Sequence, residues 1–179
     1  ARNALARRIH VLKNQRYTER VASGALHLRP GVHELFDECQ ASGIHMAVVT
    51  TTSHGNVAAL LGAHLGPRWL DRFAAVVCAE DAPVKKPDPQ AYRLVLERLQ
   101  LRSEQTVAIE DSAMGLAAAT AAGIPVVITR SRYFPDDPVP GALAVGPSLG
   151  TRAGWSPGLD GKPGRVELAD IHHWHETRG

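Results

Sequence analysis

The 179-residue sequence has few of the features that would place a protein in a membrane, a disulfide framework or a complex with nucleic acid. Its two cysteines, Cys39 and Cys78, lie in apolar surroundings, which favours two reduced, buried thiols over a disulfide. No apolar run approaches the length of a membrane span, and we find no secretory signal pattern. The formal net charge of +2 is too small to indicate nucleic-acid binding. We therefore expect a cytoplasmic protein whose partners include neither a membrane nor nucleic acid.

The pattern of apolar residues predicts alternating strands and helices. The helical spacing of apolar residues over 2–22 predicts a helix that ends near Gly24, and a break follows at Arg29-Pro30-Gly31. Beyond the break, the alternation favours an α/β fold with a mainly parallel sheet, and residues 130–165 are mostly irregular. The expected strands are residues 44–50, 74–78, 106–109, 125–129 and 142–145. The expected helices include residues 32–43, 87–99, 113–123 and 166–177, and a further helix follows residues 50–53, with an apolar face that runs from Val57 to Leu65.

Two adjacent carboxylates, Glu110 and Asp111, follow the expected strand at 106–109 directly. Ser112 is a natural N-cap for the small-residue helix that comes next. The carboxyl ends of strands are where open α/β sheets bind ligands. Two crowded carboxylates repel each other unless a cation or a positive side chain lies between them, and Mg²⁺ prefers carboxylate oxygens. The sequence therefore predicts a magnesium site at Glu110 and Asp111.

Polar residues also follow two other expected strands. Thr50 and Thr51 begin a run of four hydroxyls after the strand at 44–50, and capping the next helix requires only one of them. Lys86 lies in the loop after the strand at 74–78. Because the carboxyl ends of parallel strands share one edge of a sheet, hydroxyl, ammonium and metal-binding groups can converge there. Together they are typical of a phosphate site.

At these positions the sequence resembles the haloacid dehalogenase superfamily of phosphatases and phosphomutases. Thr50 resembles the family's second motif, Lys86 in Lys-Pro-Asp-Pro its third, and Ile-Glu-Asp-Ser at 109–112 with Gly115 its fourth. The resemblance is closest to the CbbY-type branch of sugar-bisphosphate phosphatases. Three further segments also resemble that branch: residues 13–32, the Thr-Thr-Thr-Ser cluster at 50–53 and the ending at 168–175.

The resemblance implies a three-layer sandwich and a Mg²⁺-dependent phosphohydrolase that acts on a small sugar phosphate of the xylulose-1,5-bisphosphate type. Thr50, with Thr51, would bind the phosphoryl group, and Lys86 would balance its charge. Asp111, with Glu110 beside it, would hold Mg²⁺. Arg29 is a candidate for gripping a second phosphate of the substrate, with a structural role in the linker as the alternative.

The family's first motif, Asp-x-Asp-Gly-Thr, is not found in the sequence. In the family its first aspartate is the nucleophile and its second the general acid–base. We therefore expect an N-terminally truncated chain, in which residues 1–29 are a remnant of a helical cap and residues 30–179 a core that lacks its central first strand. The strands at 44–50 and 106–110 would then flank a gap or pair directly. We predict a poorly stable chain with weakened Mg²⁺ affinity and no phosphatase activity.

Three alternatives stay open. The chain could be a non-catalytic relative that binds a phosphate or a partner chain through exposed strand edges. It could be a phosphomutase of the beta-phosphoglucomutase type. The histidines of the last predicted helix, His172, His173 and His175, could form a metal site, although an exposed helix is the simpler interpretation. For the full-length form we expect a monomer.

Overall fold

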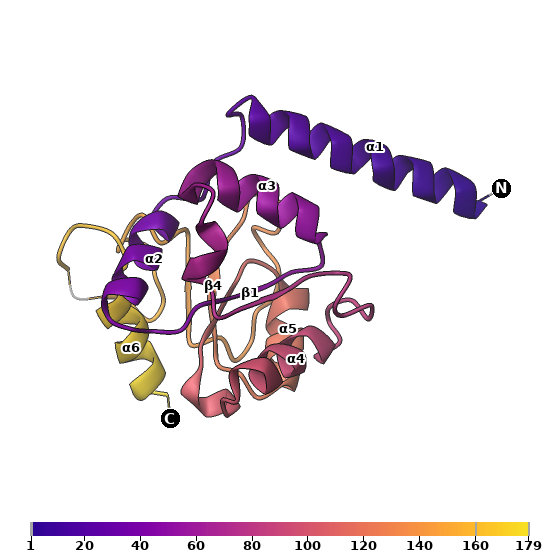
Figure 1. The fold of residues 1–179 in the computed structure, drawn as a ribbon. Helices are drawn as coiled ribbons and strands as arrows, with labels where there is room; N and C mark the ends of the chain where they lie inside the picture. The colour runs from indigo at the N-terminus through magenta and orange to yellow at the C-terminus, as the bar shows by residue number, and fades with distance from the viewer. Residues whose placement is uncertain (1, 160, 179) are drawn as a thin grey trace.

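The computed structural model describes residues 2–159 and 161–178, with the side chains of residues 2–7 and 10 left out of the description. Helix α1 (Arg2–Ala22) is a long rod that packs with its C-terminal part near α3 (His54–Leu65), as Figure 1 shows. The helical spacing of Leu5, Ile9 and Leu12 predicts one apolar face for this helix, but Ile9 and Leu12 are 58% and 54% exposed, so that part of the face is not covered. Leu5 lies outside the described side chains. None of the described helices combines the length and hydropathy that a membrane span requires.

Five short parallel strands form two separate half-sheets. Strand β1 (Ala47–Val49) pairs with β2 (Ala75–Val77), and β4 (Val126–Thr129) lies between β3 (Ala108–Glu110) and β5 (Ala144–Gly146). Each strand falls within or near its predicted range. The prediction of an α/β fold with a mainly parallel sheet is therefore confirmed.

Helices cover both faces of the three-stranded half-sheet, which gives it three layers. Helix α5 (Ala113–Ala121) and α4 (Gln90–Leu99) cover one face, where Val126 and Ile128 point. Helix α2 (Val32–Ala41) and α6 (Leu168–Glu176) cover the other, where Val127 points. The alternation along β4 is the period of two that a strand buried on both faces requires.

Glu38 ties α2 to the segment that begins α6. Its carboxylate accepts a hydrogen bond from the backbone N–H of Leu168 at 2.7 Å and pairs with Arg165. Burial alone would raise the pKa of Glu38, but these hydrogen bonds hold it below its ordinary value. Trp155, from the segment predicted as irregular, stacks on Trp174 of α6 with ring centroids 4.7 Å apart. Irregular backbone thus contributes a core side chain that the strand and helix pattern does not indicate.

Helices α3 and α4 cover the two faces of the smaller half-sheet. Val57 and Leu61 of α3 pack with Phe73 on one face, and Ala91 and Val95 of α4 pack on the other. Two short 3₁₀ helices, Trp69–Arg72 and Ser103–Gln105, lead into β2 and β3 respectively. Helix α4 therefore contributes to the layer below both half-sheets and links them through apolar contacts.

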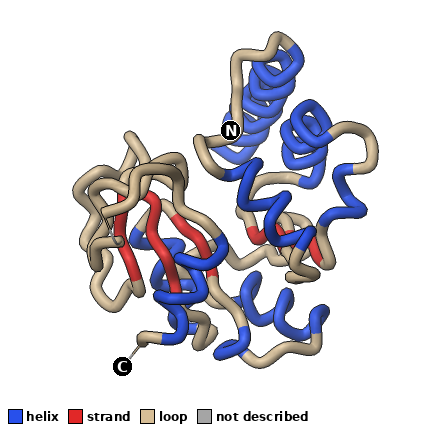
Figure 2. The backbone as a smooth tube through the Cα atoms, turned by 90° about the vertical axis from the view of Figure 1, so that its left-hand side faces the viewer, coloured by secondary structure: helices blue, strands red, loops and turns tan. Residues whose placement is uncertain are grey.

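A gap separates the facing edges of β1 and β3. Among the described residues no strand lies between these two edges, and Figure 2 shows the two groups of strands apart from each other. A cavity of about 860 Å³ is lined by residues of both strands and of α2, α4 and α6. Ile109 of β3 is 39% exposed, and Ala47 of β1 is also exposed. Of the two alternatives left open by the sequence, the structure has the gap and not the direct pairing.

Candidate functional site

The carboxyl ends of β1, β2 and β3 lie at one edge of the fold, and Lys86 connects the two half-sheets there. Its Nζ donates to the backbone oxygen of Val49, the last residue of β1, at 3.1 Å. The same Nζ forms an ion pair with the carboxylate of Glu110, the last residue of β3. The predicted convergence of Lys86 with the ends of two strands is therefore present in the structure.

The ion pair of Lys86 and Glu110 is largely buried and includes a third residue, Tyr92 of α4. The two charged side chains are 13% and 10% exposed. The Tyr92 hydroxyl donates to the Glu110 carboxylate, and its ring lies 4.9 Å from Lys86 Nζ. Burial, with the charge and hydrogen bond of Glu110, raises the pKa of Tyr92 far above its ordinary value, so the hydroxyl keeps its proton. The sequence pattern marks Tyr92 only as a core residue of a helix, so this role was missed.

The Glu110 carboxylate points inward, toward Lys86 and the first turn of α5. A Cβ built on Gly115 would overlap this carboxylate, which explains why a helix rich in alanine has glycine there. Ser112 caps α5, because its hydroxyl oxygen accepts a hydrogen bond from the N–H of Gly115 at 3.2 Å. The predicted N-cap is therefore confirmed.

Asp111 offers the freer carboxylate of the pair. It is half-buried at the end of β3, and among the described residues no hydrogen bond is donated to its side chain. Mg²⁺ is commonly held by one or two carboxylates and completes its octahedron with waters and substrate phosphate. Asp111 fits that requirement. The inward carboxylate of Glu110 fits better as the anionic partner of Lys86 than as an equal metal ligand.

The four hydroxyl residues 50–53, which follow β1, make different hydrogen bonds. Ser53 caps α3 by accepting from the N–H of Asn56, and Thr52 accepts from the Asn56 amide at 2.9 Å. Thr50 accepts from the N–H of Thr52 at 3.2 Å, which leaves the hydrogen of its hydroxyl for another acceptor. Thr51 is exposed. One hydroxyl thus caps the helix, while Thr50 and Thr51 stand beside the residue, Val49, whose carbonyl binds Lys86.

Arg29 lies at the carboxyl ends of β4 and β5, where four oxygen atoms of the protein accept hydrogen bonds from its guanidinium. Its guanidinium donates to the backbone oxygen and hydroxyl of Thr129, at 2.9 and 2.8 Å, and to the backbone oxygens of Arg130 and Pro147. These bonds tie the linker before α2 to the three-stranded half-sheet. The contacts agree with the linker role, whereas a phosphate-binding role would require some of these bonds to be exchanged.

The histidines of α6 do not form a cluster of three metal-ligating groups in the part of the chain that the structure describes. His172 and His173 are exposed, and His175 lies beside Arg178. Burial and the charge of Arg178 lower the pKa of His175. The exposed-helix interpretation is therefore in keeping with the structure.

Comparison with known proteins assigns the fold to a family. Residues 2–123 match the haloacid dehalogenase-like hydrolases. The chain belongs to this family. Over 171 residues it is 44% identical to the plasmid-encoded protein CbbY of Cupriavidus necator, covering 93% of this chain and 66% of that protein.

Two solved structures of CbbY from Rhodobacter sphaeroides are similar to the fold. One, a mutant in complex with xylulose-(1,5)bisphosphate, is 33% identical with a TM-score of 0.79 and covers 91% of this chain and 67% of that one. The other, in complex with phosphate, is 38% identical with a TM-score of 0.71 and covers 75% of this chain and 60% of that one. The haloacid dehalogenase-like chain therefore spans about two thirds of the length of these relatives, and the resemblance to the CbbY branch is confirmed.

Proposed function

We propose that this chain forms the phosphate- and metal-binding side of a Mg²⁺-dependent sugar-phosphate phosphatase. The observation that carries the proposal is Lys86, whose ammonium bonds to the end of β1 and to the end of β3 at once. The likeness to CbbY structures that hold phosphate in one case and xylulose-(1,5)bisphosphate in the other supports a phosphorylated sugar as substrate. The class of reaction is hydrolysis of a phosphoric monoester.

Each residue has a separate task in this proposal. Lys86 neutralises charge on the phosphoryl oxygens, and Glu110 and Tyr92 hold its ammonium in place. Thr50 donates its hydroxyl hydrogen to one phosphoryl oxygen. Asp111 holds Mg²⁺, which when bound supplies positive charge to the transferring group. None of these groups is a nucleophile, so the chain as described binds and orients the phosphoryl group.

The nucleophile and the general acid–base would come from the two aspartates that the family's first motif implies. We propose that an extended segment carrying them occupies the gap between β1 and β3. The edges of both strands face this gap, and its polar end is the end where Lys86 and Glu110 lie. In the same proposal, residues 1–29 belong to a helical cap and residues 30–179 to the core domain.

A second candidate function is binding without catalysis, in which the facing edges of β1 and β3 take up a strand of a partner protein. The exposed fraction of Ile109, 39%, is in keeping with it, because an apolar side chain on an open strand edge is available to a partner strand. The two candidates differ in what they require of Lys86. Phosphate binding requires its ammonium, whereas strand pairing through backbone groups does not.

Titration of the 179-residue chain with inorganic phosphate in the presence of Mg²⁺, followed by ³¹P NMR, tests the proposal. We expect Lys86→Met to weaken phosphate binding about tenfold or more, equivalent to about 1.4 kcal/mol. Its matched control, Lys85→Met, should bind as the unchanged chain does, because the Lys85 side chain is exposed. Phosphate binding that does not depend on Lys86 would overturn the proposal.

Activity is measured separately, as phosphate release from xylulose-1,5-bisphosphate. We expect none from the 179-residue chain, because no described residue at the site is placed to attack phosphorus. Release that requires Mg²⁺ and persists in a highly purified sample would show that the nucleophile lies within this chain. That result would leave the phosphatase assignment standing and refute the role given to the gap.

A further inference from the structure

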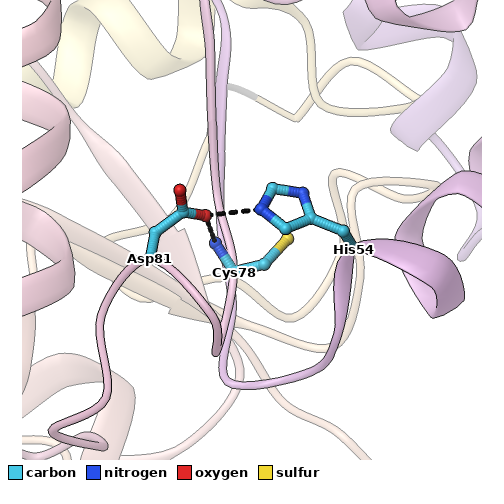
Figure 3. A group of neighbouring side chains, drawn as sticks. All are labelled: His54, Cys78 and Asp81. Carbon is cyan, nitrogen blue, oxygen red and sulfur yellow. Dashed lines mark hydrogen bonds and ion pairs between the residues drawn. The ribbon is translucent and has the colours of Figure 1, made fainter.

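His54, Cys78 and Asp81 bring three different metal-ligating groups together beside the phosphate site but outside it. His54 is the first residue of α3, Cys78 follows β2 directly, and Asp81 lies in the turn after it. Their ligand atoms, an imidazole nitrogen, a thiol sulfur and a carboxylate oxygen, all lie within 4.8 Å of one another. Figure 3 shows the imidazole of His54 next to the sulfur of Cys78, with Asp81 on its other side.

Hydrogen bonds already hold Asp81 in the orientation that a metal ligand needs. Its Oδ2 lies 2.7 Å from His54 Nε2 and accepts from the backbone N–H of Cys78 at 2.8 Å. Its other oxygen, Oδ1, accepts from Arg98 at 2.8 Å and so faces away from the cluster. Carboxylate ligands are commonly oriented in this way by an outer partner. The Arg98 hydrogen bond, with those of Cys78 and His54, lowers the pKa of Asp81 to about 2.

Hydrogen bonds join the loop after β1 to the residues after β2 and so hold the backbone around the cluster in place. The N–H of Ala79 donates to the oxygen of Thr52 at 2.9 Å, which links the loop after β1 to the end of β2. The N–H of His54 donates to the Glu80 carboxylate at 3.2 Å. The start of α3 and the turn after β2, which hold the three ligands, are therefore already joined to each other, so little rearrangement is needed to bring the ligands around one ion.

The combination of donors selects the cation. Mg²⁺ is bound by oxygen, whereas thiolate and imidazole suit Zn²⁺. In a tetrahedral zinc site, neighbouring sulfur and nitrogen ligands lie about 3.6 Å apart, so a sulfur and a nitrogen that now lie within 4.8 Å have to approach each other by no more than about 1.2 Å. The His54 side chain is 49% exposed, which gives an ion a route to the fully buried Cys78.

We propose that His54, Cys78 and Asp81 form a Zn²⁺ site, with water as the fourth ligand. On binding, Cys78 Sγ forms a bond to zinc and its proton passes to solvent. His54 Nε2 and Asp81 Oδ2 each turn from their mutual hydrogen bond to the ion. The proton that Nε2 donated to Asp81 passes to solvent, and the bound neutral imidazole carries its one proton on Nδ1, by exchange with solvent. Burial, with the nearby charges of Glu80 and Asp81, raises the pKa of Cys78 to about 11, so without a cation the group is a thiol and an unreactive one. A bound cation reverses this, since coordination deprotonates a thiol.

The site would connect a cation to the phosphate-binding loop. His54 follows the hydroxyl residues 50–53 directly, and Cys78 and Asp81 belong to the next strand end. A shared ion therefore fastens the loop that contains Thr50 to the end of β2. The site stands whether or not the proposed phosphatase function is correct, because none of its three ligands takes part in phosphate binding.

Titration of the 179-residue chain with Zn²⁺ and with Co²⁺ tests this proposal. We expect one ion per chain, a rise in the thermal unfolding midpoint with Zn²⁺, and a thiolate-to-cobalt absorption band in the near ultraviolet with Co²⁺. Cys78→Ser should abolish the band and weaken Zn²⁺ binding by more than about 10-fold, since loss of an outer partner alone can cost that much. Cys39→Ser, which removes the other buried cysteine, should keep both the absorption band with Co²⁺ and the affinity for Zn²⁺.

A second variant guards against a folding defect at the buried position. His54 is half exposed, so His54→Ala should leave the circular dichroism spectrum unchanged and still weaken Zn²⁺ binding more than about 10-fold. The double variant His172→Ala/His175→Ala should bind as the unchanged chain does. Zn²⁺ binding that survives both Cys78→Ser and His54→Ala, or that disappears with the α6 histidines, would overturn the proposal. So would the absence of a thiolate band with Co²⁺.

Discussion

Replacing Glu110 with glutamine removes the negative charge opposite Lys86 and leaves the ammonium in a place where it is only 13% exposed. Taking one partner from a buried ion pair is strongly destabilising, because an uncompensated charge remains behind. Glutamine can still accept a hydrogen bond from Tyr92, which offsets part of the loss. We expect Glu110→Gln to lower the free energy of unfolding by about 3 kcal/mol.

A double-mutant cycle separates the pair from the general cost of each substitution. Lys86→Met, Glu110→Gln and the double variant are unfolded with urea at pH 7 in the presence of EDTA, and slopes are compared to check that the unfolding mechanism is unchanged. We expect a coupling energy of about 2 kcal/mol or more. The cycle measures only what the two side chains lose together, so it is insensitive to strain that either substitution causes alone.

The pair formed by Arg68 and Asp71 is the matched control. Its side chains are 88% and 60% exposed and its atoms are 2.7 Å apart, so water screens an interaction of good geometry. We expect a coupling energy below about 1 kcal/mol for it. If the coupling energy of Lys86 and Glu110 is no larger than that of Arg68 and Asp71, Glu110 is not the buried ionic partner of Lys86. Glu110 would then be better explained as a metal ligand.

Three further outcomes follow from the contacts. Glu38→Gln should lower the free energy of unfolding by about 1–2 kcal/mol at pH 7. Because folding lowers the pKa of Glu38, the stabilisation by its carboxylate is present above the ordinary pKa of 4.5 and is lost as the pH falls below it. Urea unfolding should therefore show the variant approaching the unchanged chain in acid, whereas the exposed control Glu97→Gln should match the unchanged chain both at pH 7 and in acid. Gly115→Ala should lower the melting temperature, because the new Cβ would overlap the Glu110 carboxylate. Gly62→Ala should raise the melting temperature, because its Cβ would lie 3.6 Å from a Trp69 ring atom and alanine has a higher helix propensity than glycine. Equal shifts in melting temperature for the two variants would contradict the crowding at Gly115. Arg29→Lys should cost about 2 kcal/mol, because an ammonium cannot reproduce the guanidinium's fork of bonds to several oxygens, and an unchanged urea midpoint would show that those bonds contribute nothing.

The local structure of the site could be predicted from the sequence to a large extent. Strands before Thr50 and before Glu110 follow from short apolar runs, and the cap at Ser112 follows from a hydroxyl placed before a helical pattern. These features depend on neighbouring residues along the chain, which is why their chemistry is visible in sequence order. The convergence of Lys86 with two strand ends also followed, because parallel strands align their carboxyl ends.

The sequence by itself determined the family, the parallel arrangement of the strands and the placement of Thr50, Lys86 and Glu110 at or after strand ends, because these depend on motifs and on periodicity. Only the tertiary structure decided what the side chains contact. It turned Glu110 inward to Lys86 and Tyr92, engaged Arg29 with the ends of β4 and β5, and left a gap instead of a pairing between β1 and β3. It also brought His54, at the start of α3, next to Cys78, which follows β2. Such contacts join residues far apart in the chain, and their distances depend on how helices pack against both half-sheets, which no local pattern records.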